Sequence, residues 1–254
     1  MRAVRRFFFT ASSGSRTQIY YFEGDTGLTT SSGRVTQWDD QSGYGNHIVP
    51  VIGGAGPSLT SENSLTCPYF SANAPMRRAT FVQGAVSRPS TFYQLYRQPL
   101  GGSASMLVRS GDGTNFVEAW PRSPWVSNQF GGGQGSGGAD YFQYWMNAKS
   151  ESAGSIDASI GPLVTTTRLH LACIVSNGAS SSVYVDDMTS PIVTGTLASG
   201  TVNGLLVGGS NAAPPPLTNT FTGSVCALVA YTGADSAAQR NAVKTMFARW
   251  GTLG

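Results

Sequence analysis

Short runs of alternating apolar and polar residues dominate the chain from residue 17 onward, and turn-forming residues separate them. Alternation with a period of two is typical of β-strands that have one buried face. We expect strands in the segments "TQIYYF", "RVTQW", "ATFVQGAV", "STFYQLYR", "DYFQYWMN" and "NGLLVGG". The pattern therefore predicts an all-β protein.

Two hairpins and one fully buried strand stand out within this pattern. In "RLHLACIVSNGASSSVYVDD", apolar residues alternate as far as the pair Asn177-Gly178, which favours a tight turn because it tolerates positive φ. In "SMLVRSGDGTNFVEAW", the Gly-Asp-Gly stretch marks the tip of a second hairpin. The nearly continuous apolar run "FTGSVCALVAY" predicts a strand that is covered on both faces.

A single helix is predicted near the end of the sequence. Ser236 can cap its first turn, with Gln239 as the reciprocal partner, and Gly251 ends it. An apolar stripe follows at i, i+3, i+4 and i+7, formed by Val243, Met246, Phe247 and Trp250. We expect this helix to pack across one face of the β structure.

Composition and charge exclude several classes of protein. A length of 254 residues suits one all-β domain, and only 11% of the residues are charged. The net charge is +3, but Arg2, Arg5, Arg6 and Arg16 supply four positive charges, so the remainder carries 3 − 4 = −1. The body is nearly neutral, which argues against a nucleic-acid partner. No apolar run approaches the roughly 20 residues of a membrane-spanning helix, so we expect no membrane insertion.

Residues 1–16 form a candidate assembly arm. They combine basic residues, three consecutive phenylalanines and a Ser/Gly hinge. Apolar side chains in a terminal segment favour docking on a surface, either of the same chain or of a neighbouring one. The residues that we expect to dock are Arg5, Arg6, Phe7, Phe8 and Phe9.

The stretch "WDDQSGYGNHI" places acidic, amide and glycine residues directly after a strand. In one interpretation it is a structural turn, in which Asp40 and Asn46 bond the local backbone. The alternative is a calcium loop. Calcium takes six to eight oxygen ligands, so Asp39, Asp40 and Asn46 would need Asp186 and Asp187 from another strand. We otherwise expect no cofactor.

The sequence contains no obvious catalytic set, and we expect that the chain is not an enzyme. Sandwich glycanases need two carboxylates across a cleft, commonly from one strand. The only Glu-x-Asp here is Glu23-Gly24-Asp25, which is followed by no second glutamate and reads as a turn. We interpret His47 and His170, the only histidines, as structural residues.

Aromatic residues between positions 120 and 145 are candidates for binding a sugar or a partner protein. Exposed aromatic rings beside amide groups are typical of carbohydrate sites. Pro121 and Pro124 indicate a loop, which would present Trp125 at the surface. The candidate residues are Trp125, Trp120, Tyr144, Trp145 and Asn128.

Three segments together resemble the laminin-G/concanavalin A-like jelly-roll family, in the subgroup common among phage and bacterial surface proteins. They are "GRVTQWDDQSGYGNHI", "RLHLACIVSNGASSSVYVDD" and "FTGSVCALVAYTGADSAAQRNAVKTMFARWG", in the family's order. The resemblance implies a two-sheet antiparallel jelly-roll sandwich over residues 17–254 with one C-terminal helix. It says less about function, because this sandwich hosts lectins, glycanases and structural modules.

Two functions follow as hypotheses. The first is a non-catalytic virion protein of a tailed phage, which decorates the capsid or forms part of a spike or fibre. It would be made in the host cytoplasm, lie on the virion surface, and contact other virion proteins or copies of itself. The alternative is a carbohydrate-binding module of a bacterial or phage-tail surface protein, with a cell-surface glycan as its ligand.

Overall fold

The computed structural model describes ten segments of the chain. For the strands between residues 108 and 160 it describes the backbone and the register. The described segments are 16–51, 56–71, 74–97, 108–111, 116–125, 143–150, 154–160, 168–197, 201–209 and 221–251.

The larger of two antiparallel sheets, sheet A, has ten strands in the order β16-β15-β14-β9-β19-β6-β5-β3-β2, with β1 also paired to β19. The strand β19 pairs with β9 along one edge and with β6 and β1 along the other. The strands of sheet A are β1 (Gln18–Glu23), β2 (Leu28–Ser31), β3 (Arg34–Trp38), β5 (Ser58–Glu62), β6 (Leu65–Phe70), β9 (Ser90–Arg97), β14 (His170–Ser176), β15 (Ser181–Val185), β16 (Val193–Gly195) and β19 (Gly223–Thr232).

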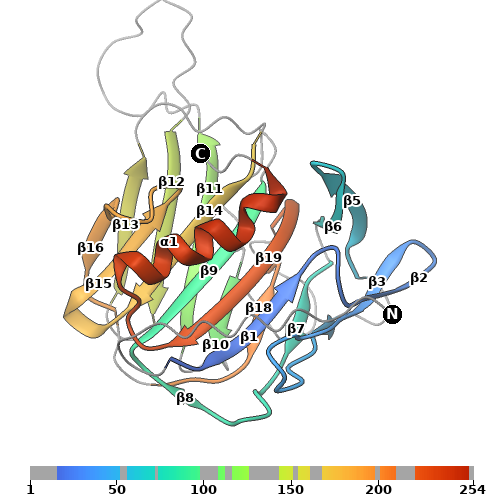
Figure 1. Cartoon of the computed structure of the whole chain (residues 1–254), viewed down its shortest axis with the longest axis horizontal. Coiled ribbons are helices and arrows are strands. Elements are labelled where there is room, and N and C mark those ends of the chain that lie inside the picture. Colours follow the sequence, from blue (N-terminus) through green and yellow to red (C-terminus); the bar gives the residue numbers. More distant parts are fainter. Residues whose placement is uncertain are drawn as a thin grey trace, which may run out of the picture.

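The second sheet, sheet B, has seven strands in the order β13-β12-β11-β10-β18-β7-β4 and lies behind sheet A in Figure 1. Its strands are β4 (Val49–Pro50), β7 (Met76–Arg78), β10 (Val108–Gly111), β11 (Phe116–Trp125), β12 (Gln143–Ser150), β13 (Gly154–Ile160) and β18 (Leu205–Val207). A third, two-stranded sheet consists of β8 (Val86–Ser87) and β17 (Thr201–Val202).

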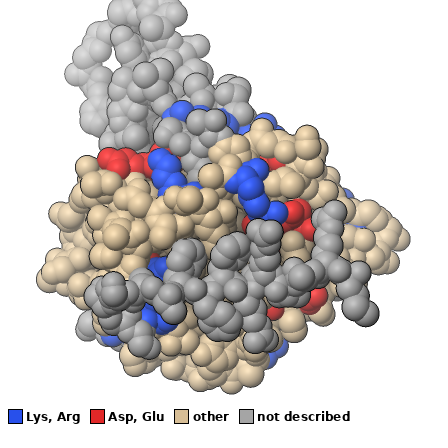
Figure 2. Space-filling view, in the orientation of Figure 1, with Lys and Arg blue, Asp and Glu red and all other residues tan. Residues whose placement is uncertain are grey.

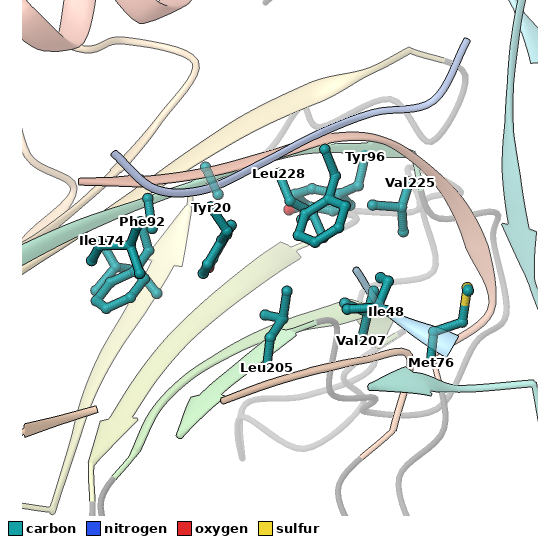
Figure 3. Close-up of a cluster of buried hydrophobic side chains, with 14 of the residues drawn as sticks. Tyr20, Ile48, Met76, Phe92, Tyr96, Ile174, Leu205, Val207, Val225 and Leu228 are labelled. Carbon is teal, nitrogen blue, oxygen red and sulfur yellow. The ribbon is translucent and has the colours of Figure 1, made fainter. Parts of the chain in front are cut away.

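The main core fills the space between the two sheets. Side chains of β1, β9 and β14 meet those of β7 and β18, as Figure 3 shows for Tyr20, Phe92, Ile174, Met76 and Leu205. All five are at most 1% exposed. Burial of a large apolar side chain contributes about 1.5–3 kcal/mol, so this layer is the main source of stability.

A second apolar layer lies on the opposite face of sheet A, beneath the helix α1 (Ala237–Met246) and the short helix η2 (Phe247–Trp250) (Figure 1). Val243, Phe247 and Trp250 are fully buried there. The capping box between Ser236 and Gln239 is present. The predicted helix and its packing face are therefore confirmed.

The predicted fold class, an all-β two-sheet antiparallel sandwich with one C-terminal helix, is confirmed. Nine of the ten residues of β19 are buried, and seven of them, residues 225–231, divide between the two apolar layers. The hairpin of β14 and β15 turns through the short helix η1 (Gly178–Ser180), with positive φ at Gly178. The strands β10 and β11 also pair as predicted.

The strand predicted in "ATFVQGAV" is wrong for most of its length, since only Val86 belongs to a strand. Side-chain amides bind this backbone in place of a neighbouring strand. Asn203 Oδ1 accepts from the Phe81 amide, and Asn46 Oδ1 accepts from the Val82 amide, both at 2.8 Å. Alternation alone does not distinguish a sheet ladder from such side-chain bonds.

We predict that Leu228→Ala lowers the free energy of unfolding by about 2–5 kcal/mol, because it leaves a cavity in the layer between the sheets. Leu59→Ala is the matched control: Leu59 is 40% exposed, and we expect a loss below about 1 kcal/mol. Urea unfolding followed by tryptophan fluorescence measures both. Equal losses in the two variants would contradict the assignment of the core.

Candidate functional surface

One face of sheet B packs on the core and the other is turned away from it. The alternating residues of β18 identify these two faces. Leu205 and Val207 belong to the core between the sheets, whereas Leu206, although only 3% exposed, belongs to neither apolar layer. Because successive residues of a strand lie on opposite faces, Leu206 lies on the face of sheet B that is turned away from the core. We call this the outer face.

Strand register extends the outer face across sheet B. Residues directly opposite one another on neighbouring antiparallel strands share a face. The row that contains Leu206 comprises Val49, Arg77, Leu206, Arg109, Glu118, Lys149 and Ser155.

Three further positions along β11 continue the outer face. Trp120 lies opposite Asn147, which lies opposite Asp157. Two residues on, the next row comprises Arg122, Trp145 and Ser159. A bulge follows, after which Trp125 lies opposite Gln143. The outer face therefore holds three tryptophans, two acids, two amides and several basic residues.

The inner face of the same strands is mostly apolar, as a face packed on the core should be. On β13 it holds Ile156, Ala158 and Ile160. Alternation and register agree, since the polar residues of β13 fall in the rows that continue from Leu206. This agreement supports the division into two faces.

Three of the predicted site residues, Trp120, Trp125 and Trp145, come together on the outer face. Tyr144 lies opposite Ile160 on the inner face, so we leave it out of the candidate surface. Asn128 falls outside the described residues, and so does the arm with Arg5, Arg6, Phe7, Phe8 and Phe9. Their roles stay predictions.

The loop predicted at Pro121 and Pro124 is wrong, because β11 continues through both prolines to Trp125. In the described part of the chain, β10 begins at Val108, opposite Ala119, and Pro121 is paired with Met146 of β12. A proline lacks the N–H that a ladder bond needs, so sheets tolerate it at an edge or beside a bulge. The bulge between Arg122 and Trp125 completes the adjustment.

Sequence reasoning missed Glu118, Asn147, Lys149 and Asp157 as members of this surface. The signal in "GSIDASI" was the alternation of Ile156, Ala158 and Ile160 with polar residues. Alternation, however, cannot give the register between strands that are not yet paired. Only the pairing of β11 with β12 and β13 brings these residues into neighbouring rows.

Chemically, the outer face has the components of a carbohydrate site. Tryptophan offers a flat apolar surface to a sugar ring, and carboxylates and amides exchange hydrogen bonds with its hydroxyls. A surface of this kind is usually built with a few polar groups around apolar ones. The outer face combines both on three adjacent strands.

The "WDDQSGYGNHI" stretch is a structural turn, as the first interpretation held. Both Asp40 carboxylate oxygens accept bonds: Oδ1 from the Tyr21 and Ser42 amides, Oδ2 from the Ser42 hydroxyl and the Asn46 amide, all at 2.7–2.9 Å. The Asn46 side chain donates to the Ile19 carbonyl at 3.0 Å. All the bonds to Asp40 come from N–H and O–H donors, which favours the structural turn; the calcium alternative stays a prediction.

His170 is also structural, as predicted. Its Nδ1 lies 2.8 Å from Asp186 Oδ2, and its side chain is 2% exposed. The Leu171 amide donates to the other Asp186 oxygen at 3.0 Å, and Lys244 Nζ donates to the Asp186 carbonyl at 2.6 Å. This cluster ties the β14–β15 hairpin to α1.

The Glu23-Gly24-Asp25 turn binds the end of the chain to β1. Arg249 forms a bidentate pair with Asp25 at 2.6 and 2.9 Å, and its Nε donates to Glu23 Oε1 at 2.6 Å. The Tyr21 hydroxyl donates to the other Glu23 oxygen at 2.5 Å. Burial and the Glu23 carboxylate raise the pKa of Tyr21, which keeps this hydroxyl protonated.

Arg16, the first described residue, is anchored beside the C-terminal end of β19 in sheet A. It pairs with Asp235 and lies over the Tyr231 ring, 3.9 Å from its centroid. The Tyr93 hydroxyl also donates to Asp235, at 2.6 Å. Burial raises the pKa of Asp235, although Tyr93 and Arg16 act in the opposite direction.

The described segments contain no metal-binding cluster, no membrane-spanning helix and no disulfide. No three His, Cys, Asp or Glu side chains in them are grouped to hold a metal ion. None of their helices is long and apolar enough to span a bilayer. Cys67, Cys173 and Cys226 are buried free thiols.

Comparisons with known proteins identify a fold and no family. No family model matches the sequence, and no curated protein does either. The jelly-roll part of the predicted resemblance agrees with the fold, whereas membership of the laminin-G group stays a prediction.

Solved structures of proteins that act on sugars are similar to this chain. A GH54 α-L-arabinofuranosidase soaked with a cyclic sulfate inhibitor has a TM-score of 0.61 at 14% identity, over 93% of this chain and 60% of that one. Domain 4 of AbnA, a GH43 extracellular arabinanase from Geobacillus stearothermophilus in complex with arabinotriose, has a TM-score of 0.57 at 14% identity, over 91% and 99%. A Trypanosoma rangeli sialidase in complex with sialic acid has 0.56 at 10%, over 93% and 34%.

These identities establish a shared β-sandwich fold alone, and the chain spans less than two thirds of the arabinofuranosidase and the sialidase. They nevertheless overturn one prediction. The prediction that the chain is not an enzyme is wrong, because the similar structures include glycoside hydrolases. The sequence has no strand that carries both catalytic carboxylates of a glycanase. Two different strands could still supply one carboxylate each.

We predict that Asp40→Ala lowers the free energy of unfolding by about 3 kcal/mol or more, because buried donors lose a charged acceptor. Asp39→Ala is the control. Its side chain is 39% exposed, so we expect a loss below about 1 kcal/mol. Urea unfolding measures both, and adding calcium to the wild type should leave the midpoint unchanged. Stabilisation by calcium would restore the cation interpretation.

Proposed function

We propose that this protein binds carbohydrate on the outer face of sheet B, with Trp120 and Trp145 as the principal contacts. The observation that carries the proposal is the register. It brings both tryptophans, together with Asn147, Glu118 and Asp157, onto one face of three adjacent strands. An aromatic platform beside amide and carboxylate groups is suited to a sugar ring with its hydroxyls.

The comparisons support a carbohydrate ligand more than a role in a virion. The arabinanase domain that carries arabinotriose matches this chain over nearly the full length of both. None of the similar structures named above is a phage protein, so the hypothesis of a tailed-phage virion protein gains no support from them. A surface protein that adheres to glycans, which was the alternative from the sequence, is the better proposal.

Glycoside hydrolysis is a second candidate, favoured by two acids on the outer face. Asp157 lies two strands from Trp120, which is two residues from Glu118. Strand spacings of about 4.8 Å and rises of about 3.4 Å per residue give a Cα separation of about 12 Å. From there, two carboxyl groups can approach the roughly 5–9.5 Å found in glycosidases.

We predict that Trp120→Ala and Trp145→Ala each weaken binding to the preferred glycan at least tenfold, because truncating a central aromatic contact costs about 2 kcal/mol. A polysaccharide panel that includes arabinan identifies the glycan, and calorimetric titration gives the affinities. Tyr44→Ala is the matched control, since Tyr44 is a 38%-exposed ring in the Asp40 turn. No binding to any glycan, or unchanged binding in both tryptophan variants, would refute the proposal.

Hydrolysis has a separate test. If the outer face is catalytic, the wild type releases reducing sugar from the bound glycan, and Glu118→Gln and Asp157→Asn each reduce that rate at least about a hundredfold. Both variants should still bind the glycan in the titration. Binding without any release of reducing sugar would remove this candidate and leave the binding proposal intact.

A further inference from the structure

We propose that the preferred ligand is an acidic polysaccharide that carries carboxylate groups, such as a polyuronate, and that Arg109 and Arg122 select it. This inference rests on the proposed carbohydrate-binding function and names the chemical class of its ligand. The observation behind it is a concentration of basic residues on the outer face around the two tryptophans.

Charge on the outer face is unbalanced toward positive. Within the described strands it holds the basic residues Arg77, Arg109, Arg122 and Lys149 against the acidic residues Glu118 and Asp157, so their formal charge is 4 − 2 = +2. The whole chain, by comparison, has 16 basic and 13 acidic residues. The opposite side of the molecule, which carries α1, shows its charged atoms in small groups of both signs on a largely uncharged surface (Figure 2).

The basic residues lie where a sugar on the tryptophans would meet them. Arg122 is directly opposite Trp145, and two residues from Trp120 along β11. Arg109 is opposite Glu118, which is two residues from Trp120 in the other direction. A polysaccharide that crosses from Trp145 on β12 to Trp120 on β11 would continue along the same diagonal to Arg109 on β10, with Arg122 beside its path, opposite Trp145.

Arginine at these positions favours a carboxylate over a neutral sugar. Its planar guanidinium matches a carboxylate with two parallel hydrogen bonds, whereas a hydroxyl takes one. Glu118 and Asp157 on the same face would repel a densely charged polyanion. A polymer with one carboxylate per sugar, spaced by hydroxyls, fits this mixture better than a nucleic acid or a heavily sulfated chain.

The test compares three soluble polymers on the intact chain by calorimetric titration: polygalacturonate, neutral arabinan and dextran sulfate. We expect polygalacturonate to bind at least tenfold more tightly than either of the others in dilute buffer. Raising the salt concentration from about 0.02 M to about 0.5 M should remove most of that preference through screening, and should leave any arabinan binding unchanged.

Substitution of the two arginines tests whether they cause the preference for polygalacturonate over neutral arabinan. Arg109→Gln and Arg122→Gln should each weaken polygalacturonate binding about tenfold and leave any arabinan binding unaltered, because a bidentate charged pair is lost. Arg34→Gln, at an exposed position on β3 of sheet A, is the matched control and should change neither. Thermal melting checks that each variant is folded. The salt series uses the wild-type chain, so it tests the preference even if a variant does not fold.

The outcomes separate this inference from the proposed function. Arabinan binding that depends on Trp120 and Trp145, with no preference for polygalacturonate, would overturn the inference and leave carbohydrate binding in place. Tighter binding of dextran sulfate would likewise overturn the carboxylate assignment. Failure to bind any of these polymers, or any other glycan, would refute both.

Discussion

Burial of sheet A on both faces is the constraint on which the rest of the structure depends. Its central strands β9, β14 and β19 are buried along almost their whole length. A sheet of this kind is stable only if both faces are covered, since each exposed apolar side chain would cost burial free energy. Sheet B covers one face, and α1 with η2 covers the other.

Polar contacts hold α1 and η2 in place on sheet A. Arg249 binds the Glu23–Asp25 turn, Lys244 binds the Asp186 carbonyl, and Arg240 donates to the Met188 carbonyl at 2.8 Å. Each contact joins the last segment of the chain to a strand end far away in the sequence. These contacts orient a helix that apolar packing alone would hold less specifically.

Sheet B carries the surface that we propose as the functional one. Its inner face completes the core, while its outer face is built from tryptophans, amides and charged residues. The same sandwich occurs in structures of arabinofuranosidases, an arabinanase domain and a sialidase. What such a sandwich does depends on the residues placed on its faces, and not on the fold.

Local sequence determined several of the elements. Alternation marked β1, β3, β9, β12 and the β14–β15 hairpin, and capping residues with an apolar stripe marked α1, because each is a short-range pattern set by backbone periodicity. Tertiary structure decided the rest. The segment around Phe81 is not a strand, because Asn46 and Asn203 from distant loops bind its backbone. Likewise, Trp120, Trp145 and Asp157 share a surface only because β11, β12 and β13 pair in one register, and register arises from contacts between strands that no single segment contains.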